Sequence, residues 1–410
     1  MDFHAVVGPG NGDVVIVGAG PAGVSTALML LRAVPSAASR LIVLERAKFP
    51  RDKICAGAIA ARGERVLREL DAVPDVPSAW IHGISLRSAG KEAAVELTAP
   101  IGRVVRRLEY DAALVEIARQ RGVKIVEDTQ VVGISPLEEG AQVETTRGVL
   151  RAAVVVGADG VGSVVRKAIG CDGAGSLRAQ VVEVDTEPTS SDRKASLLHF
   201  DLNDTTLAGY TWDFPTIVDG QRLMCRGVYQ VRGAGDTTDV GTRLDARLEA
   251  LGLDPTQYKR KRYAELGFAR RAKIAKDAVL LVGEAAGIDP GTGEGIAPSL
   301  RYGAIAGRFI AEVLDGKARV SDWPRALARS GLGKDLLLRS TVTRAYHAGG
   351  RSSIDRFLTR SPRALRAGCQ YFGNQPIPRT QLLRLVFGAV AQTAWHYVSF
   401  ANSRPSTSPM

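Results

Sequence analysis

A glycine pattern near the start of the chain is the first place where residues suited to holding a ligand occur together. Gly18-Ala19-Gly20-Pro21-Ala22-Gly23 follows an apolar run at Asp13–Val17 and leads into a stretch typical of a helix. At such a turn, unpaired N–H groups and the helix dipole favour a phosphate. A second apolar run, Leu41–Leu44, ends at Glu45, whose carboxylate can accept hydrogen bonds from a ribose. This order of strand, turn, helix and strand predicts a βαβ unit that binds a dinucleotide.

The three glycines of this pattern have separate expected roles. Gly18 permits the tight turn, Gly20 lets the backbone approach a pyrophosphate, and Gly23 lets the helix pack closely on the strand. A glycine turn without a ligand is the alternative interpretation. The acidic Glu45 at the end of the second strand argues against that alternative.

An aromatic stretch is the second feature that points to a binding site. The sequence GYTWDFPT at Gly209–Thr216 holds three aromatic residues within five positions, in a chain that is 6% aromatic. On a strand, alternation places Tyr210, Trp212 and Phe214 on one face. Such a wall suits an apolar ligand, and a purely structural role in the core is the alternative.

Two later strands also end in acidic residues. The run Ala153–Val156 is followed by Asp159, and the run Ala278–Val282 is followed by Glu284. A glycine-rich loop then leads into a helix predicted over 296–314. Open α/β sheets bind ligands at the carboxyl ends of their strands, so both acidic residues are candidates for the same site.

The remaining patterns predict an α/β chain with a Rossmann-like nucleotide-binding domain, an inserted antiparallel-sheet substrate domain and a helical C-terminal segment. Residues 181–268 alternate as strands do, and residues 83–97 are expected to add a strand pair to the same sheet. The predicted boundaries are 1–80, 103–180 and 272–320 for the nucleotide domain, 81–102 and 181–271 for the substrate domain, and 321–410 for the C-terminal segment.

The charge distribution sets the C-terminal segment apart. The net charge is +11, and residues 321–410 hold 13 Lys and Arg against 3 Asp and no Glu. This segment lacks the lysine clusters and stacking aromatics of a nucleic-acid arm, so no nucleic-acid partner is expected. An ordinary solvated helical face is one interpretation. Contact with an anionic lipid surface or with a phosphorylated substrate is another.

Cysteine and histidine usage argues against a metal site. The four cysteines form no C-x-x-C pair, and the five histidines are scattered. This pattern is typical of a reducing compartment rather than of a disulfide framework. The first 13 residues also lack a basic region followed by an apolar core, so we expect no signal peptide and a cytoplasmic protein.

Three motifs in this order resemble the flavoproteins with the para-hydroxybenzoate hydroxylase fold. They are GAGPAG with Glu45, GADG with Arg166, and VGEAAG followed by GTGEGI. Within that family, FPRDKICAG resembles the Pro-Arg-x-Lys-x-Cys-Gly-Gly stretch of the geranylgeranyl reductases. Tyr210-Thr211-Trp212-Asp213-Phe214-Pro215 also matches the Tyr-x-Trp-x-Phe-Pro signature of that subfamily.

The resemblance implies FAD as the cofactor and assigns roles to individual residues. It implies that Cys55 lies close to the reacting carbon, and that Tyr210, Trp212 and Phe214 line the substrate cavity. A small buried residue is the alternative for Cys55. The residues implied to hold FAD are Gly18, Gly20, Gly23, Glu45, Arg46, Arg107, Asp159, Glu284, Gly295 and Ile296. The chain departs from the family pattern at two places, Glu284 in place of an aspartate and Ala56 in place of a glycine.

A reductase is the function that the resemblance favours. Reduced FAD would pass a hydride to a C=C bond of an isoprenoid, lipid or related apolar substrate, with NAD(P)H or a separate reductase as electron donor. The alternative is a monooxygenase or halogenase that uses O2 on an aromatic or polyketide-type compound. A flavin-binding scaffold without activity is the third, non-enzymatic interpretation.

The most apolar part of the C-terminal segment is Leu382–Phe400. Polar residues interrupt it, and its unbroken apolar run is far shorter than the ~20 residues that a membrane span needs. A helix that closes the substrate tunnel is one expectation. An interfacial helix that contacts the inner membrane face and admits a lipid substrate is the other.

Overall fold

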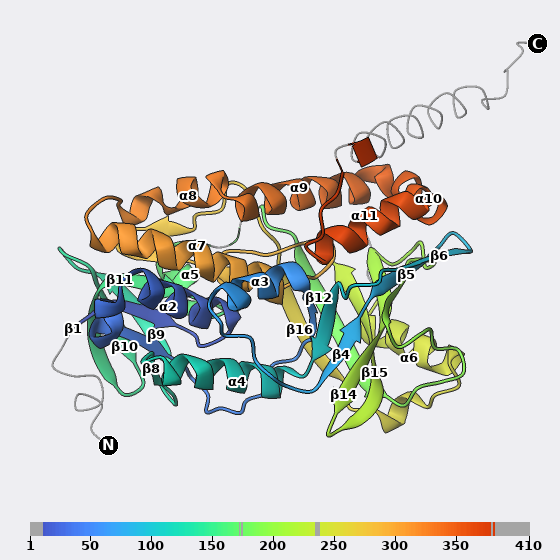
Figure 1. Ribbon diagram of the computed structural model, residues 1–410, viewed down its shortest axis with the longest axis horizontal. Helices are drawn as coiled ribbons and strands as arrows, with labels where there is room; N and C mark the ends of the chain where they lie inside the picture. Colours follow the sequence, from blue (N-terminus) through green and yellow to red (C-terminus); the bar gives the residue numbers. More distant parts are fainter. Residues whose placement is uncertain (1–10, 172, 174, 234–237, 379, 382–410) are drawn as a thin grey trace, which may run out of the picture.

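The computed structural model describes residues 11–381, apart from 172, 174, 234–237 and 379. Figure 1 shows two sheet-containing regions side by side, with the C-terminal helices lying along one side of both. The predicted segment Leu382–Phe400 lies outside the described residues. No helix within the described ranges has the length and apolar character needed to cross a bilayer.

The first region is built on a parallel sheet in the order β18-β11-β1-β2-β8. Its strands are buried on both faces, as Val15, Ile16 and Val43 show with 0% exposure, which is why they read as continuous apolar runs. Antiparallel strands extend it at two places. The members of this sheet are β1 (Asn11–Val17), β2 (Leu41–Leu44), β8 (Lys124–Val126), β9 (Val131–Pro136), β10 (Ala141–Thr145), β11 (Gly148–Gly157), β17 (Ala275–Lys276) and β18 (Val279–Leu281).

Helices cover this sheet, and two of them pack unusually closely. A β-carbon at Gly303 of α7 (Ile296–Leu314) would lie 1.9 Å from Ser25 Oγ of α2 (Pro21–Ala33). Because Gly303 has no side chain, the two helix backbones can approach each other at this position. The other helices of this region are α3 (Ala61–Glu69), α4 (Arg107–Gln120) and α5 (Val164–Ala168), with short helical turns η1 (Pro35–Arg40), η3 (Gly283–Ala285) and η4 (Val320–Asp322).

The second region is a seven-stranded sheet in the order β16-β12-β15-β14-β13-β5-β6. The predicted strand pair at 83–97 joins it as β5 and β6. The sheet is not wholly antiparallel, however, because β13 and β5 pair in parallel. Its strands are β5 (Gly83–Ser88), β6 (Lys91–Glu96), β12 (Arg178–Thr186), β13 (Leu197–Asp201), β14 (Gly209–Val218), β15 (Gln221–Val231) and β16 (Lys261–Leu266).

The two faces of the second sheet bury different clusters. Val182, Val228 and Leu244 pack on the side of α6 (Val240–Ala250), which the short turn η2 (Pro255–Gln257) follows. Trp212 and Tyr229 pack on the opposite side. This alternation follows from the two-residue period of a strand. A separate three-stranded sheet, which the sequence did not predict, consists of β3 (Ala58–Ala60), β7 (Gly102–Val105) and β4 (Ser78–Ile81).

The predicted C-terminal helices are α8 (Trp323–Arg329), α9 (Gly331–Ala345), α10 (Arg351–Arg360) and α11 (Pro362–Phe372). Helices α9 and α10 meet at a kink over Tyr346–Gly350, where Gly349 has a φ of 110°. Helices α10 and α11 lie against β5 and β6, and α9 lies near α7 (Figure 1). The predicted fold class, a Rossmann-like region with an additional sheet and C-terminal helices, is thereby confirmed.

Candidate active site

The glycine turn forms an open cradle at the start of α2. Gly18 has a φ of 104°, and a β-carbon there would lie 2.5 Å from the carbonyl oxygen of Ala158. A β-carbon at Gly23 would lie 1.9 Å from the carbonyl oxygen of Gly18. At Gly20, by contrast, a β-carbon would meet nothing closer than Arg51 Nη2 at 3.9 Å. Gly18 and Gly23 therefore allow the turn to close, whereas Gly20 leaves the surface of the turn free for a ligand.

The N-terminus of α2 suits a phosphate at this cradle. Gly20 is the residue before the helix, no described side chain caps it, and Pro21 occupies the first helical position. The next N–H groups have no partner within the helix, so they and the helix dipole favour an anion. The residues present therefore fit the pyrophosphate of a dinucleotide.

Glu45 and Arg51 border the cradle. Glu45 is 5% exposed, and its Oε2 accepts a hydrogen bond from the Ala19 amide at 3.0 Å. Arg51 places Nη2 at 3.5 Å from the same oxygen and Nη1 at 3.3 Å from Asp111 Oδ2. The Arg51 Nε is buried without a partner among the described residues. Arg51 belongs to the FPRDKICAG stretch, but it was not among the predicted site residues.

Two predicted cofactor residues differ in their surroundings. Arg107 is buried and donates from Nε and Nη2 to the two carboxylate oxygens of Asp111, at 2.8 and 2.7 Å. Its guanidinium is thus held in place by a residue four positions later, which sequence reasoning missed. Arg46 is exposed beside Glu45. Arg46 lies near the cradle because it comes two residues after the end of β2.

Asp159 organises the turn between β11 and α5. Its carboxylate accepts hydrogen bonds from Ser163 Oγ at 2.5 Å and from the amides of Val164 at 2.7 Å and Val165 at 3.2 Å. Burial raises the pKa of Asp159, and these hydrogen bonds oppose that rise. The carboxylate caps the short helix α5, so it fixes the loop that follows β11.

Glu284 lies across from that loop. A β-carbon at Gly160 would be 3.7 Å from Glu284 Oε2, and Lys53 Nζ donates to the same oxygen at 3.1 Å. The pairing with Lys53 was not predicted. It joins the FPRDKICAG stretch to the turn after β18.

The loop before α7 is held by side chains from the second sheet. Tyr210 Oη donates to the carbonyl of Thr292 at 2.6 Å, and Tyr229 Oη donates to the carbonyl of Pro290 at 3.1 Å. Gly295 precedes α7, where no described side chain caps the helix, and Ile296 is buried. The loop therefore presents the amides of a helix N-terminus to whatever lies beside it.

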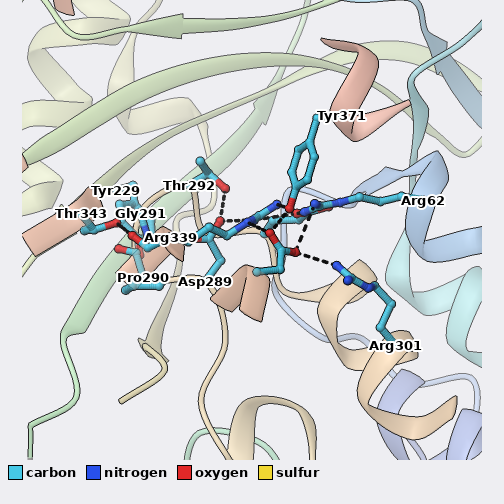
Figure 2. A network of polar contacts seen from close by, with 12 residues as sticks. Arg62, Tyr229, Asp289, Pro290, Gly291, Thr292, Arg301, Arg339, Thr343 and Tyr371 are labelled. Carbon is cyan, nitrogen blue, oxygen red and sulfur yellow. Dashed lines mark hydrogen bonds and ion pairs between the residues drawn. The ribbon is translucent and has the colours of Figure 1, made fainter. Parts of the chain in front are cut away.

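A buried network of charges fixes the same loop from the other side (Figure 2). Arg339 of α9 contacts Asp289 and donates to Glu294 Oε2 at 2.9 Å. Arg62 of α3 contacts Glu294 and lies 3.4 Å from Asp335 Oδ2. Arg301 and Tyr371 complete the network through Asp335. No local sequence pattern predicted this network, because its members come from distant segments.

Aromatic side chains form one wall of a cavity. The rings of Tyr210 and Tyr229 stack with centroids 5.1 Å apart, and Phe200 meets Tyr210 edge-on at 5.3 Å. The rings of Trp212 and Phe214 continue the wall, with centroids 6.0 Å apart. Phe200 and Tyr229 were missed, although both lie on strand-like stretches with the same alternation.

The cavity has a volume of about 390 Å³. It is bordered by the aromatic wall, by Cys55–Ala60, by the loop Gly291–Ile296 and by side chains of α9 to α11. Of the predicted site residues it brings together Cys55, Tyr210, Trp212, Phe214, Gly295 and Ile296. The other predicted residues do not line it. They lie at the glycine cradle, after the ends of β2, β11 and β18, and, in the case of Arg107, at the start of α4.

Cys55 is half-buried at the cavity wall. Burial raises the pKa of its thiol, and the nearby Arg107 opposes that rise. The thiol therefore keeps its proton more firmly than a free cysteine does.

A family model described as an FAD binding domain matches residues 11–323. The chain belongs to this family. As a member it is an FAD-dependent oxidoreductase, so FAD as the predicted cofactor is confirmed. When bound, FAD supplies hydride or electron transfer. Gly20 and the start of α2 would hold its pyrophosphate, Glu45 its ribose, and the start of α7 its flavin ring.

Two relatives of this FAD-binding protein bear the names of reductases. The digeranylgeranylglycerophospholipid reductase 1 of Methanopyrus kandleri is 29% identical over 330 residues, which cover 74% of this chain and 81% of that protein. The menaquinone reductase of Mycobacterium tuberculosis is 28% identical over 360 residues, which cover 78% of this chain and 80% of that protein.

Solved structures show the same fold in proteins of different activity. A geranylgeranyl bacteriochlorophyll reductase-like protein from Thermoplasma acidophilum has a TM-score of 0.64 at 18% identity, covering 91% of this chain and 95% of that chain. The p-nitrophenol 4-monooxygenase PnpA from Pseudomonas putida has a TM-score of 0.67 at 20% identity, covering 90% and 99%. The predicted resemblance to para-hydroxybenzoate hydroxylase-type and geranylgeranyl reductase-type flavoproteins is confirmed.

Proposed function

We propose that this FAD-binding protein reduces C=C bonds of an isoprenoid or a related apolar substrate. The observation that carries the proposal is the aromatic-walled cavity, which has Cys55 on one border and the loop before α7 on another. The electron donor is proposed to be NAD(P)H or a separate reductase. FAD reduced by that donor would supply the hydride, and the chain would supply position, proton and exclusion of water.

The cavity suits a hydrocarbon chain better than a polar compound. Its volume of about 390 Å³ lies within the range of small-molecule sites. The hydroxyls of Tyr210 and Tyr229 are already bonded to backbone carbonyls of the loop. Burying an apolar chain against these rings would contribute about 25 cal/mol per Å². A dry wall would also keep water away from the transferred hydride.

The two relatives named as reductases support the proposal, because their names specify isoprenoid-bearing compounds as substrates. Their identity to this chain is 28–29%. The monooxygenase and a brominase with a TM-score of 0.61 share the fold alone. An O2-dependent reaction is accordingly the outcome against which the reductase is tested.

The test is a reoxidation experiment without O2. The FAD of the purified protein is reduced photochemically, and a geranylgeranyl lipid is added while the flavin absorbance is followed. The expected result is reoxidation together with a product two hydrogens heavier. The fully saturated lipid is the matched control and should leave the flavin reduced. Reoxidation that needs O2 and gives an oxygenated or halogenated product would overturn the proposal.

We also propose that the basic C-terminal segment contacts an anionic membrane surface from which such a substrate enters. The 13 basic residues in 321–410 support this proposal. Several of them are engaged internally, as Arg339 and Arg351 are. Flotation of the full chain with anionic and with zwitterionic vesicles tests the idea. Binding to the anionic vesicles alone is expected, and equal behaviour with both would refute it.

A further inference from the structure

A row of paired residues crosses the second sheet from its edge to the cavity. Lys261 on the edge strand β16 is paired with Glu183 on β12, and Glu183 is paired with Gly227 on β15. Gly227 is paired in turn with Trp212 on β14, which lines the cavity. Paired residues project from the same face of a sheet. The row therefore runs from a side chain that is 16% exposed, Lys261, to the aromatic wall.

Glu183 is the unusual member of this row. It is 1% exposed, and neither carboxylate oxygen has a hydrogen-bond partner among the described residues. Two cations act on this carboxyl, Lys261 and Arg106, but both contact a different acid: Lys261 Nζ and Arg106 Nη1 lie 2.7 and 3.0 Å from Asp185 Oδ2. An unpaired buried carboxylate is costly, so this group favours the neutral acid.

The electrostatic surroundings of Glu183 agree with that geometry. Burial raises the pKa of Glu183 to about 7, Lys261 and Arg106 oppose the rise, and Asp185 adds to it. Tyr263 and Cys225 lie near the same carboxyl, and burial raises the pKa of both, so each is neutral. An acid whose pKa is near neutrality can both release and regain a proton during turnover.

Glu183 lies next to Cys55. Its carboxyl faces the backbone amide of Cys55, and its charge acts on the thiol. Two cations act on the thiol in the opposite sense, Arg107, which is paired with Asp111, and Lys53, which is paired with Glu284. Cys55 thus lies between the cavity and this buried carboxyl.

We propose that Glu183 is the proton reserve of Cys55. The inference rests on the proposed alkene reduction. The hydride adds to one carbon of the C=C bond, and the S–H bond of Cys55 breaks as its proton forms a C–H bond at the other carbon. The thiolate then takes the proton of Glu183, and the resulting carboxylate regains one from solvent along the row that begins at Lys261. The alkene is reduced by two electrons from the flavin, and the thiol is neither oxidised nor consumed.

The first test concerns the chain alone and needs no turnover. The rate at which iodoacetamide alkylates Cys55 is measured against pH in the FAD-bound, substrate-free protein, with peptide mass spectrometry to follow Cys55 specifically. Loss of a nearby carboxylate in Glu183→Gln should ease ionisation of the thiol above pH 7. A decrease of one in the pKa corresponds to about tenfold more thiolate, so we expect alkylation at pH 8 to rise roughly threefold to tenfold.

The matched control is Glu187→Gln. The Glu187 carboxylate is exposed and lies just beyond the end of β12, and its pKa is lowered mainly by a hydrogen bond from Tyr258. This variant should alkylate as the wild type does. An unchanged pH profile in Glu183→Gln would overturn the inference, whatever reaction the protein catalyses.

The second test measures the proton step in a single turnover. Glu183→Gln should slow the anaerobic reoxidation by a polyprenyl lipid at least tenfold and abolish its dependence on pH near 7, while reduction of the flavin proceeds as in the wild type. A wild-type protein that no polyprenyl lipid reoxidises would refute the proposed function, and the alkylation result would still decide the pairing. A Glu183→Gln variant with the wild-type turnover rate and pH profile would refute the proton reserve alone.

Discussion

The indole ring of Trp212 occupies the space that a side chain would take at Gly227 on the neighbouring strand. A β-carbon at Gly227 would lie 2.1 Å from Cζ2 of that ring. The two residues are direct partners in the register of β14 and β15. Because Gly227 has no side chain, the Trp212 ring can lie over this strand while it lines the cavity.

Gly227→Ala tests this relationship. The added methyl group must displace the ring or bend the strands, so we expect the free energy of unfolding to fall by about 1–3 kcal/mol. Urea titration measures the loss. Gly331→Ala is the control, because a β-carbon there meets no atom within 4 Å. Gly227→Ala should cost less stability in a Trp212→Leu variant, which lacks the indole ring, than in the wild type. An equal cost in both backgrounds would contradict the steric explanation.

Substitutions at Gly20 and Gly23 of the glycine cradle test ligand binding and folding separately, because a β-carbon has room at Gly20 but not at Gly23. Gly20→Ala fits the backbone, whose φ of −76° and ψ of −178° any residue adopts, and its β-carbon has open space. We expect the stability of the apoprotein to change by less than about 0.5 kcal/mol. The methyl group would occupy the approach of the pyrophosphate, so the Kd for FAD should rise at least about tenfold, or about 1.4 kcal/mol. Fluorescence titration with FAD measures it.

Gly23→Ala provides the contrast within the same turn. Its β-carbon would lie 1.9 Å from the carbonyl oxygen of Gly18, so this variant should lose stability before any ligand is added. FAD affinity in Gly20→Ala equal to that of the wild type would show that the pyrophosphate does not lie at this turn.

Local patterns predicted much of the fold. The unit of β1, α2 and β2 and the start of α7 at Ile296 follow from runs of apolar residues next to glycines. The three-stranded sheet was missed because β3 and β7 are short, and Gly57 and Gly102 let their backbones approach from distant parts of the chain. A parallel pair such as β13 with β5 leaves no trace in either strand alone.

The candidate site shows the same division. Gly20 and Tyr210 belong to contiguous motifs, so their positions could be anticipated. The partners that hold the site were not anticipated: Asp111 beside Arg107, Lys53 beside Glu284, and Arg339 beside Glu294. Each of these pairs joins charges whose spacing in sequence is either common or very long, so sequence alone gives no reason to choose them.

The charge network around Arg339 should contribute strongly to stability. Arg339→Met would leave Asp289 and Glu294 buried with fewer positive neighbours, and burial already raises the pKa of both carboxyls. Removing one partner of a buried ion pair typically costs about 3–5 kcal/mol, which urea titration would detect.

Arg325→Met is the control for that network, because its side chain is 70% exposed, and it should change stability by less than about 0.5 kcal/mol. Adding Asp289→Asn to Arg339→Met should restore part of the loss by removing one unpaired charge. Equal stability of Arg339→Met and Arg325→Met would show that the network does not hold the loop.

The buried Glu183 predicts a pH dependence of stability with a definite sign. Its pKa is about 7 in the folded protein against the ordinary value of 4.5, so the folded state binds the extra proton between these values. The stability contributed by the protonated acid is full below about pH 4.5 and is lost as the pH rises toward 7 and beyond. Glu183→Gln lacks this loss, so its free energy of unfolding relative to the wild type should increase by about 3 kcal/mol between pH 4.5 and pH 8. Urea titrations of both proteins across that range measure the difference, and a constant difference would show that Glu183 is ionised in the folded protein.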